Sequence, residues 1–436
     1  MDLQAENATL REALRVLQER YDRLNATSAE QIQDLTDGNE VLAEANRLLL
    51  EQQTPHPSAS VQDVPSLVQV PDELLLPVRE PLFQPLVILD KVHAFGNLLS
   101  VSAHVTRSTL VITGGADKCV GVHDWERKMQ LCVQETSGPV LALAFNPKAE
   151  YADYFVAAGM DARHALYRLV QAGDAWHVQV VAEFHEHSRQ GAFQVAWSAS
   201  GLLFATGASD KVVNVYQCSG LVEGGGESGG EQCKKIKSFY FNGTIEALVF
   251  APDAVLEDME AGREMRHELL LIAVRDDCYV HYVDCITFEK ERVNMNPDGI
   301  EHVSYTIMDL SLSPSGKYLL AATDSNRNFI FAVKQNAALR NFYGHKAGPY
   351  SQPRAIWHPS EKYVISNNED SGAIFVWSIA SERVVKTLDA HDGLVRDLAC
   401  FSPPVSTGPP LLITVSYDKR MKVWELPLAK ADVGTM

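Results

Sequence analysis

The sequence predicts an all-β fold, a seven-bladed β-propeller, preceded by a long α-helical coiled coil. Three observations lead to this prediction: a leucine repeat over the first fifty residues, a proline-rich stretch after it, and a motif that recurs seven times over the rest of the chain. At 436 residues the chain exceeds one ordinary domain, so at least two structural units are expected. The expected boundaries are a coiled coil over 1–52, a linker over 53–84, a propeller over 85–427 and a tail over 428–436.

Leucines recur with alternating spacings of three and four over residues 1–51, which contain no proline. Ten of the fourteen positions in the register from Leu3 to Leu49 are apolar. Such a repeat keeps facing a partner helix only when the helices supercoil. Because a single helix of this kind has no core for its leucines, it needs a second chain, and a homodimer and a heteromer are equally compatible with the pattern. The strongest part of the expected seam is Leu10, Leu14, Leu17, Tyr21 and Leu24.

Six prolines follow between Thr54 and Gln84. Proline removes backbone donors and favours extended conformations, so this stretch is expected to be a semi-stiff linker. A short apolar patch from Asp72 to Leu76 interrupts it. That patch can dock on the following domain or serve as a short linear motif.

An aspartate in a turn context recurs seven times after residue 90, at intervals of 44 to 49 residues and one interval of 66. The seven positions are Asp117, Asp161, Asp210, Asp276, Asp324, Asp370 and Asp418. Apolar runs flank each aspartate, and another short strand pattern lies upstream, as in Val140–Phe145. Four short strands in a repeat of about 45 residues are typical of a propeller blade. Leu86 to Leu89, before the first complete repeat, can supply the outer strand of the last blade and so close the ring.

The two last repeats carry the most specific motif residues. Gly344-His345 and Ala390-His391 open them, and Trp377 and Trp424 stand near their ends. In these features the sequence resembles the WD-repeat family, although Ser378 and Glu425 replace the family's final aspartate. The resemblance implies a structural tetrad in the seventh repeat, in which a buried polar chain satisfies all its hydrogen bonds. Its expected members are His391, Ser416, Asp418 and Trp424.

The net charge and the cysteine content indicate the environment in which the chain is expected to work. The formal net charge of −18 argues against a general affinity for nucleic acid or anionic membranes. No apolar run approaches the ~20 residues that span a bilayer, and the N-terminus lacks the order of a signal peptide. Seven cysteines without a CxxC pair predict neither a disulfide framework nor a zinc site. A soluble, reduced, cytoplasmic protein is expected, with a nuclear location also possible.

The sequence lacks the common motifs of catalytic sites. It contains no phosphate-binding glycine loop between a strand and a helix, no HExxH and no GxSxG. His185 and His187, near His177, come closest to a metal set, but the connection in which they lie is one where the family often places a histidine. No catalytic residue, cofactor or metal is therefore expected, and the protein is expected not to be an enzyme.

The family resemblance places many cations on the narrow top face of the propeller. Two interpretations stay open: the cations bind an acidic or phosphorylated peptide, for which arginine is well suited, or they are solvated turn residues. The expected rim residues are Lys118, Arg163, Lys211, Arg275, Arg327, Lys419 and Arg420, with Tyr350, Arg354 and Arg396 closer to the channel.

The predicted function is a protein-interaction scaffold, oligomerised by the coiled coil, with partners on the top face of the propeller. The alternative is a substrate receptor of a cullin-type ubiquitin ligase. Such receptors often carry Trp-Asp-x-Arg at a blade end. The nearest stretch in this chain runs from His123 to Glu126, with Arg127 one place late.

Overall fold

A computed structural model describes residues 14, 15, 18, 20, 69–76, 83–93, 95–191, 193–219, 221, 233–251, 267–348, 351–402 and 408–426. The chain divides into two compact units, Met1–Leu67 and Val68–Met436. The predicted coiled-coil seam, the tail and Tyr350 lie outside the described residues, apart from Leu14. Leu14, Arg15, Gln18 and Arg20 are helical and exposed. Among the described residues, no helix has the length and apolarity needed to cross a membrane.

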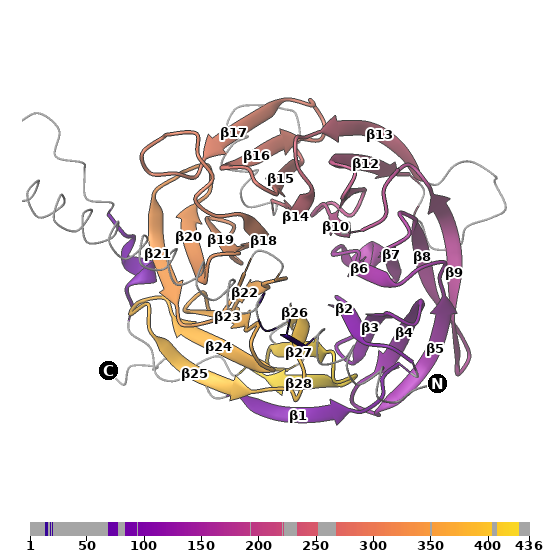
Figure 1. Ribbon diagram of the computed structural model, residues 1–436. Coiled ribbons are helices and arrows are strands. Elements are labelled where there is room, and N and C mark those ends of the chain that lie inside the picture. The colour runs from indigo at the N-terminus through magenta and orange to yellow at the C-terminus, as the bar shows by residue number, and fades with distance from the viewer. Residues whose placement is uncertain are drawn as a thin grey trace, which may run out of the picture. The chain divides into compact units, whose positions relative to one another are not determined.

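The second unit contains seven four-stranded antiparallel sheets arranged as the blades of a ring (Figure 1), which confirms the predicted seven-bladed β-propeller. Blade 1 consists of β2 (Leu98–Ala103), β3 (Leu110–Gly115), β4 (Cys119–Asp124) and β5 (Met129–Glu135). Blade 2 consists of β6 (Val140–Phe145), β7 (Tyr154–Gly159), β8 (His164–Ala172) and β9 (Ala175–Phe184). Blade 3 consists of β10 (Phe193–Trp197), β11 (Leu203–Ala208), β12 (Val212–Cys218) and β13 (Cys233–Tyr240). Blade 4 consists of β14 (Ile245–Phe250), β15 (Leu269–Val274), β16 (Tyr279–Asp284) and β17 (Lys290–Asn294). Blade 5 consists of β18 (Ile307–Leu312), β19 (Tyr318–Thr323), β20 (Arg327–Ala332) and β21 (Ala338–Tyr343). Blade 6 consists of β22 (Ala355–Trp357), β23 (Tyr363–Asn367), β24 (Ala373–Ser378) and β25 (Val384–Asp389). Blade 7 consists of β26 (Val395–Phe401), β27 (Leu411–Ser416), β28 (Met421–Glu425) and β1 (Gln84–Leu89).

The seventh blade is built from both ends of the ring. β1 pairs antiparallel with β28, so that Leu89 faces Met421 and Gln84 faces Glu425. The prediction that residues 86–89 supply the outer strand is therefore confirmed. This pairing covers the edge of β28 that would otherwise present unpaired backbone groups.

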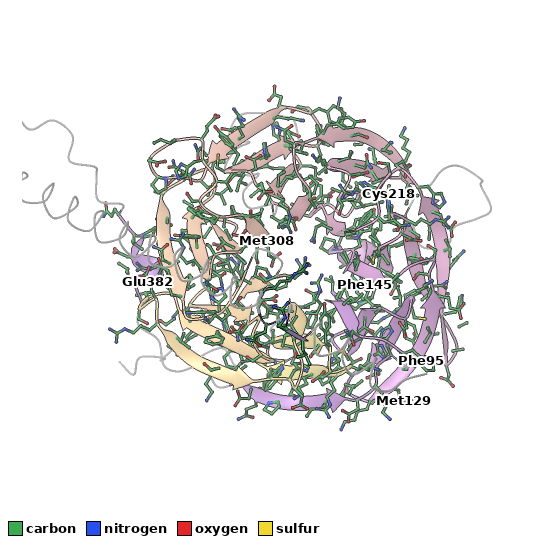
Figure 2. All side chains as sticks on the ribbon, viewed as in Figure 1. Phe95, Met129, Phe145, Cys218, Met308 and Glu382 are labelled. Carbon is green, nitrogen blue, oxygen red and sulfur yellow. A yellow bond between two sulfur atoms is a disulfide. The ribbon has the colours of Figure 1, made fainter. Side chains whose placement is uncertain are left out.

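Burial along the strands follows their place in the blade. The second strand of every blade is buried along its whole length, because neighbouring blades cover both of its faces. Outer strands such as β9 alternate between exposed and partly buried residues. In Figure 2, Phe145 and Met308 from inner strands lie near the centre, whereas Met129 and Glu382 lie at the periphery.

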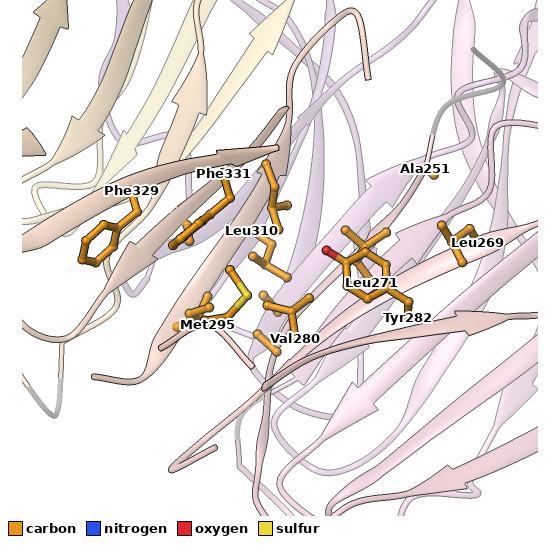
Figure 3. Close-up of a cluster of buried hydrophobic side chains, with 14 residues drawn as sticks. Ala251, Leu269, Leu271, Val280, Tyr282, Met295, Leu310, Phe329 and Phe331 are labelled. Carbon is orange, nitrogen blue, oxygen red and sulfur yellow. The ribbon is translucent and has the colours of Figure 1, made fainter. Parts of the chain in front are cut away.

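Hydrophobic clusters lie between adjacent blades, and each of the seven interfaces has one. Between blades 4 and 5, Leu271 and Tyr282 pack with Leu310, Phe329 and Phe331 (Figure 3). Removing this apolar surface from water stabilises the contact of each blade with its neighbours. Since a terminal blade of an open array would leave one such face in water, the clusters favour a closed ring.

Part of the expected linker packs on the propeller. The 3₁₀ helix η1 (Asp72–Leu74) places Leu74 in the cluster between blades 5 and 6, where it is 3% exposed. The Tyr318 hydroxyl donates to Glu73 at 2.8 Å. Of the two interpretations of this apolar patch, docking on the following domain is confirmed. A second 3₁₀ helix, η2 (Ala149–Tyr151), lies between β6 and β7.

Cys218 and Cys233 form a disulfide, so the expectation of a chain without disulfides is wrong at this pair. The two residues end β12 and begin β13 and face each other in the strand pairing. Fifteen residues separate them in sequence, across the Gly-rich insertion of residues 220–230. The spacing of the two cysteines matches no local motif, so the sequence did not predict the pair. The pairing of β12 with β13 brings them together. Among the other cysteines, burial raises the pKa of Cys132 to about 11 and of Cys400 to about 12.

Candidate interaction face and central channel

The top face of the propeller is the face formed by two kinds of segment. These are the turns between the second and third strands of each blade and the connections that lead into the next inner strand. Backbone hydrogen bonds tie the two kinds together: Met160 N donates to Pro139 O at 2.8 Å, and Tyr417 N donates to Leu394 O at 2.9 Å. The top face is therefore a set of short, mutually braced segments on a rigid scaffold.

Blade 7 contains the expected polar network, but with a different hydroxyl. His391 Nδ1 bonds Asp418 at 3.0 Å and its Nε2 bonds the Thr414 hydroxyl at 2.7 Å, which also accepts from Trp424 Nε1 at 3.3 Å. The expected Ser416 is therefore wrong as the tetrad hydroxyl. Its Oγ instead donates to Gly393 O at 3.0 Å and accepts from Asp418 N at 3.1 Å.

The same network recurs in two other blades. In blade 1, His93 bridges Asp117 and Thr113 at 2.8 Å each, and Thr113 bonds His123 at 2.9 Å. In blade 3, His187 bridges Asp210 at 3.0 Å and Thr206 at 2.9 Å. His187 thus has the structural place that the family resemblance implied, not that of a metal ligand. Within the described residues, no group of three or more His, Cys, Asp or Glu side chains is placed to hold a metal ion.

Burial lowers the pKa of three of these histidines, His123, His187 and His391. Burial, and secondly the neighbouring His93, lower the pKa of His123 to about 3. Burial also lowers the pKa of His391, although Asp418 acts in the opposite direction. The networks are therefore satisfied structural elements, which stabilise the top-face turns.

Most arginines expected on the rim are matched by carboxylates. The observed pairs are Arg163–Asp161 at 4.0 Å, Arg275–Glu246 at 2.6 Å, and Arg420 with Asp90 at 2.8 Å and Asp392 at 2.6 Å. Arg327 lies over the rings of Tyr305 and Phe329, with its Cζ 5.9 and 5.2 Å from their centroids. The expected excess of positive charge on this face is thus largely neutralised within the chain itself.

Lys118, Lys211 and Lys419 form a second group of rim cations. All three occupy equivalent turn positions with φ between 64° and 68° and are exposed. In the part of the chain that the structure describes they make no ion pair. They are the rim cations that remain accessible to a partner.

The central channel holds a partly buried ionic cluster around Arg354. Its Nη1 lies 2.9 Å from Asp309 and its Nε 3.6 Å from Asp397. The same carboxylates accept from the backbone N–H groups of Ala355 at 3.1 Å and Val101 at 3.0 Å. Burial raises the pKa of Asp309 despite Arg354, and Asp309 and Asp397 raise the pKa of Arg354 against the effect of burial. Arg354 therefore joins inner strands of three blades rather than facing a partner.

Arg396 lies beside this cluster and is buried. Its Nη2 donates to Gln352 Oε1 at 2.9 Å, whereas Nη1 has no hydrogen-bond partner among the described residues. Burial, and secondly Arg354, lower its pKa. A cavity of about 160 Å³ adjoins the channel cluster and is lined by Val101, Gln194 and Leu248 among others.

Sequence reasoning missed the acidic half of the channel. Asp309 and Asp397 occupy equivalent places, two residues after the first residue of an inner strand, in Ile307–Asp309 and Val395–Asp397. A carboxylate at the same place in two inner strands was the available signal.

Large apolar side chains stand exposed on the top face, among them Phe95 and Met160 and, in the connection into blade 5, Ile300 and Val303. Phe95, in the connection into blade 1, is 79% exposed, and Met160, in the neighbouring turn of blade 2, is 47% exposed (Figure 2 labels Phe95). Exposed apolar side chains on braced segments are typical of interaction surfaces. No sequence pattern singled them out, because their exposure follows from the fold.

Comparison with known proteins gives matches to parts of the chain. The family model described as "WD domain, G-beta repeat" matches residues 178–217 and 382–425, which lie in blades 2–3 and 6–7. GID complex subunit 7 of Schizosaccharomyces pombe is 24% identical over 118 residues, 27% of this chain and 22% of that protein. Periodic tryptophan protein 2 homolog is 36% identical over 67 residues in Mus musculus and 31% over 68 in S. pombe, about 15% of this chain and 7% of each relative.

The chain therefore spans less than a quarter of each of these relatives in the aligned regions. Both matched segments nevertheless coincide with strands of the propeller blades, so the family match agrees with the structure. Together with seven four-stranded sheets and the histidine–aspartate networks, they identify the chain as a WD-repeat β-propeller.

Proposed function

We propose that this protein is a non-enzymatic interaction scaffold, cytoplasmic, that binds other proteins on the top face of its propeller and is oligomerised by a coiled coil over residues 1–52. The observation that carries the proposal is the exposure of Phe95 and Met160 on braced segments of adjacent blades. Apolar anchors surrounded by polar residues commonly dominate the binding energy of protein interfaces. Such an interface depends on a rigid scaffold that holds the contacting side chains in place rather than on reactive groups.

The comparisons support this class of function. WD-repeat propellers are generally interaction modules, and one relative is named as the subunit of a complex. That the top face binds an acidic or phosphorylated peptide is a more specific prediction. Such a peptide has Lys118, Lys211 and Lys419 available, because three of the rim arginines pair with carboxylates and Arg327 lies over two aromatic rings.

Affinity purification of matched variants tests the top face. Phe95→Ala/Met160→Ser removes the two anchors. Leu202→Ser/Ile286→Ser removes two exposed apolar side chains from turns on the opposite face. Partners quantified by mass spectrometry should fall at least about tenfold with the first variant and stay unchanged with the second, as expected for anchors contributing ~1.4 kcal/mol or more. Equal recovery with both variants would contradict the top-face proposal.

Solution mass tests the oligomeric state. The full chain is expected to be a dimer or a larger assembly by light scattering, whereas residues 68–436 alone should be monomeric. A monomer in both cases would contradict the proposed coiled coil. The same purification addresses the alternative of a ubiquitin-ligase substrate receptor. Cullin-type ligase subunits that depend on the propeller would favour that alternative.

A further inference from the structure

Blade 2 lacks two members of the polar network that blades 1, 3 and 7 share. Its inner strand begins with Val140 paired with Gly159, as Val395 pairs with Ser416 in blade 7. This alignment fixes which residues of blade 2 take the network positions. In blade 2, Thr136 occupies the position of His391, and Ala157 occupies that of Thr414. Asp161 occupies the position of Asp418, and Tyr167 occupies that of Trp424.

A cavity of about 180 Å³ lies at this place, between blades 1 and 2, and we call it the blade 1–2 cavity. Its lining includes Gln134 and Thr136 from blade 1, and Ala157, Tyr167 and Glu183 from blade 2. Its volume is more than ten times the roughly 10–15 Å³ that one water molecule needs. The loss of an imidazole and a hydroxyl explains why blade 2 has this space.

Tyr167 carries an unpartnered polar group into the cavity. The residue is 6% exposed, and its ring stacks on Phe155 with centroids 5.2 Å apart. In blades 1 and 7 the ring at this position bonds a threonine hydroxyl, but Ala157 offers none. Within the described residues the Tyr167 hydroxyl has no hydrogen-bond partner. The Thr136 hydroxyl lies 2.9 Å from both Lys118 O and Gly138 O and donates its single proton to one of them.

Glu183 lines this cavity, and Asp161 lines an adjoining pocket; Glu183 and Arg163 line both. Glu183 pairs with Ala165 across β8 and β9, on the side of the sheet that also carries Tyr167. The Asp161 carboxylate lies against the backbone of Gly138 and Gly159, where an added Cβ would come within 2.7 and 2.5 Å of it. Burial, then Glu183 and Asp161, raise the pKa of Tyr167 to about 12, so the hydroxyl stays protonated beside both acids. Arg163 is the nearby counter-charge, but its Nε is 4.0 Å from Asp161 and its side chain is 59% exposed.

We propose that the blade 1–2 cavity binds an arginine side chain of a partner protein. Its guanidinium would donate to Glu183 and Asp161 and to the oxygen of the Tyr167 hydroxyl. Its aliphatic stem would contact Val140 and Val180, which also line the cavity. A planar, forked, always charged group suits two carboxylates and an aromatic wall better than an ammonium does. The partner in this proposal rests on the proposed scaffold function; the cavity adjoins the turn that carries Met160, whereas Phe95 does not line it.

A small probe tests the site without any partner. The full chain is labelled at alanine methyl groups, and N-acetyl-arginine methylamide is titrated while the methyl signals of Ala157 and Ala165 are followed by NMR. Saturable shifts of both signals are expected. The citrulline analogue, which has the same shape without the charge, should give no saturable shift. Absence of saturable shifts with arginine, or equal shifts with citrulline, overturns the proposal.

Two variants locate the binding. Thr136→His/Ala157→Thr installs the network residues of the other blades in the cavity and should abolish the shift of Ala165. Its unfolding midpoint should be equal to or above that of the wild type, which shows that binding is not lost through misfolding. Glu183→Gln should weaken binding roughly tenfold, as expected for a hydrogen bond to a charged group. Unchanged arginine binding in the filled variant overturns the site. If the probe fails while Phe95→Ala/Met160→Ser still loses partners, only the cavity proposal falls.

Discussion

Thr414 and Ser416 illustrate what sequence spacing can and cannot fix at the scale of a residue. The histidine, aspartate and tryptophan of the blade 7 network were predicted from their motif, and the structure joins them. The hydroxyl was misplaced by two residues. Because side chains alternate along a strand, residues two apart share a face, and both hydroxyls point to the same side of β27. Only the distance to His391 Nε2 distinguishes them.

A double-mutant cycle tests this assignment. Thr414→Val leaves His391 Nε2 and Trp424 Nε1 without their partner, so the free energy of unfolding should fall by about 1–3 kcal/mol. Combined with His391→Leu, Thr414→Val should show a coupling energy of at least ~0.5 kcal/mol in urea unfolding. Ser416→Ala combined with His391→Leu serves as the control and should show a smaller coupling. The reverse order would restore Ser416 as the tetrad hydroxyl.

Buried histidines predict a dependence of stability on pH. Burial lowers the pKa of His345 and His358 to about 4, and burial with His93 lowers that of His123 to about 3. In the unfolded chain these groups titrate near 6.5, so below that pH the unfolded state binds more protons. Stability is thus complete above pH 6.5 and falls as pH decreases toward 4, by up to ~1.4 kcal/mol per pH unit for each histidine.

Urea unfolding at pH 7.5, 6.5 and 5.5 measures this slope. His358→Gln should reduce it by up to about 1.4 kcal/mol per pH unit relative to the wild type, since one proton-linked group is removed. The comparison isolates the histidine from buried carboxylates such as Glu246, whose pKa burial raises. An identical slope in both proteins would contradict neutral burial of His358.

At the scale of elements, η1 separates what a proline-rich composition predicts from what tertiary packing adds. Composition predicted a linker, yet the apolar patch inside it reaches the core. Leu74 is 3% exposed, whereas the adjacent Leu75 and Leu76 are 44% and 52% exposed. Leu74→Ala should lower the free energy of unfolding by about 2–5 kcal/mol. Leu75→Ala is the matched control and should change it by less than ~0.5 kcal/mol. Equal effects would show that the patch does not dock.

The disulfide between β12 and β13 is an element-level feature that spacing could not show. Cross-linking a loop of about 15 residues stabilises a fold by roughly 3 kcal/mol in the chain-entropy account. Adding dithiothreitol should therefore lower the thermal midpoint of the wild type. Cys218→Ala/Cys233→Ala should not respond to the reductant. A wild-type midpoint that is indifferent to dithiothreitol, with both thiols alkylated, would contradict the stabilising role.

At the scale of the whole molecule, the periodic aspartates predicted seven blades, and the apolar run from Leu86 to Leu89 predicted the outer strand that closes the ring. Periodicity succeeds because each repeat can bury its apolar faces only against a neighbour, and a cluster lies at every interface. The charge of the top face was harder to predict. Which carboxylate meets which arginine depends on contacts such as Arg275–Glu246, 29 residues apart, which no local pattern encodes.

Ring closure by β1 is the central claim about the architecture, and two truncations test it directly. Residues 83–436 keep β1 and residues 90–436 lack it, while both lack η1, so their difference isolates the pairing with β28. Urea unfolding should be cooperative for 83–436 and should shift to clearly lower urea, or lose cooperativity, for 90–436. The same midpoint and the same cooperativity in both truncations would contradict a ring closed by its first strand.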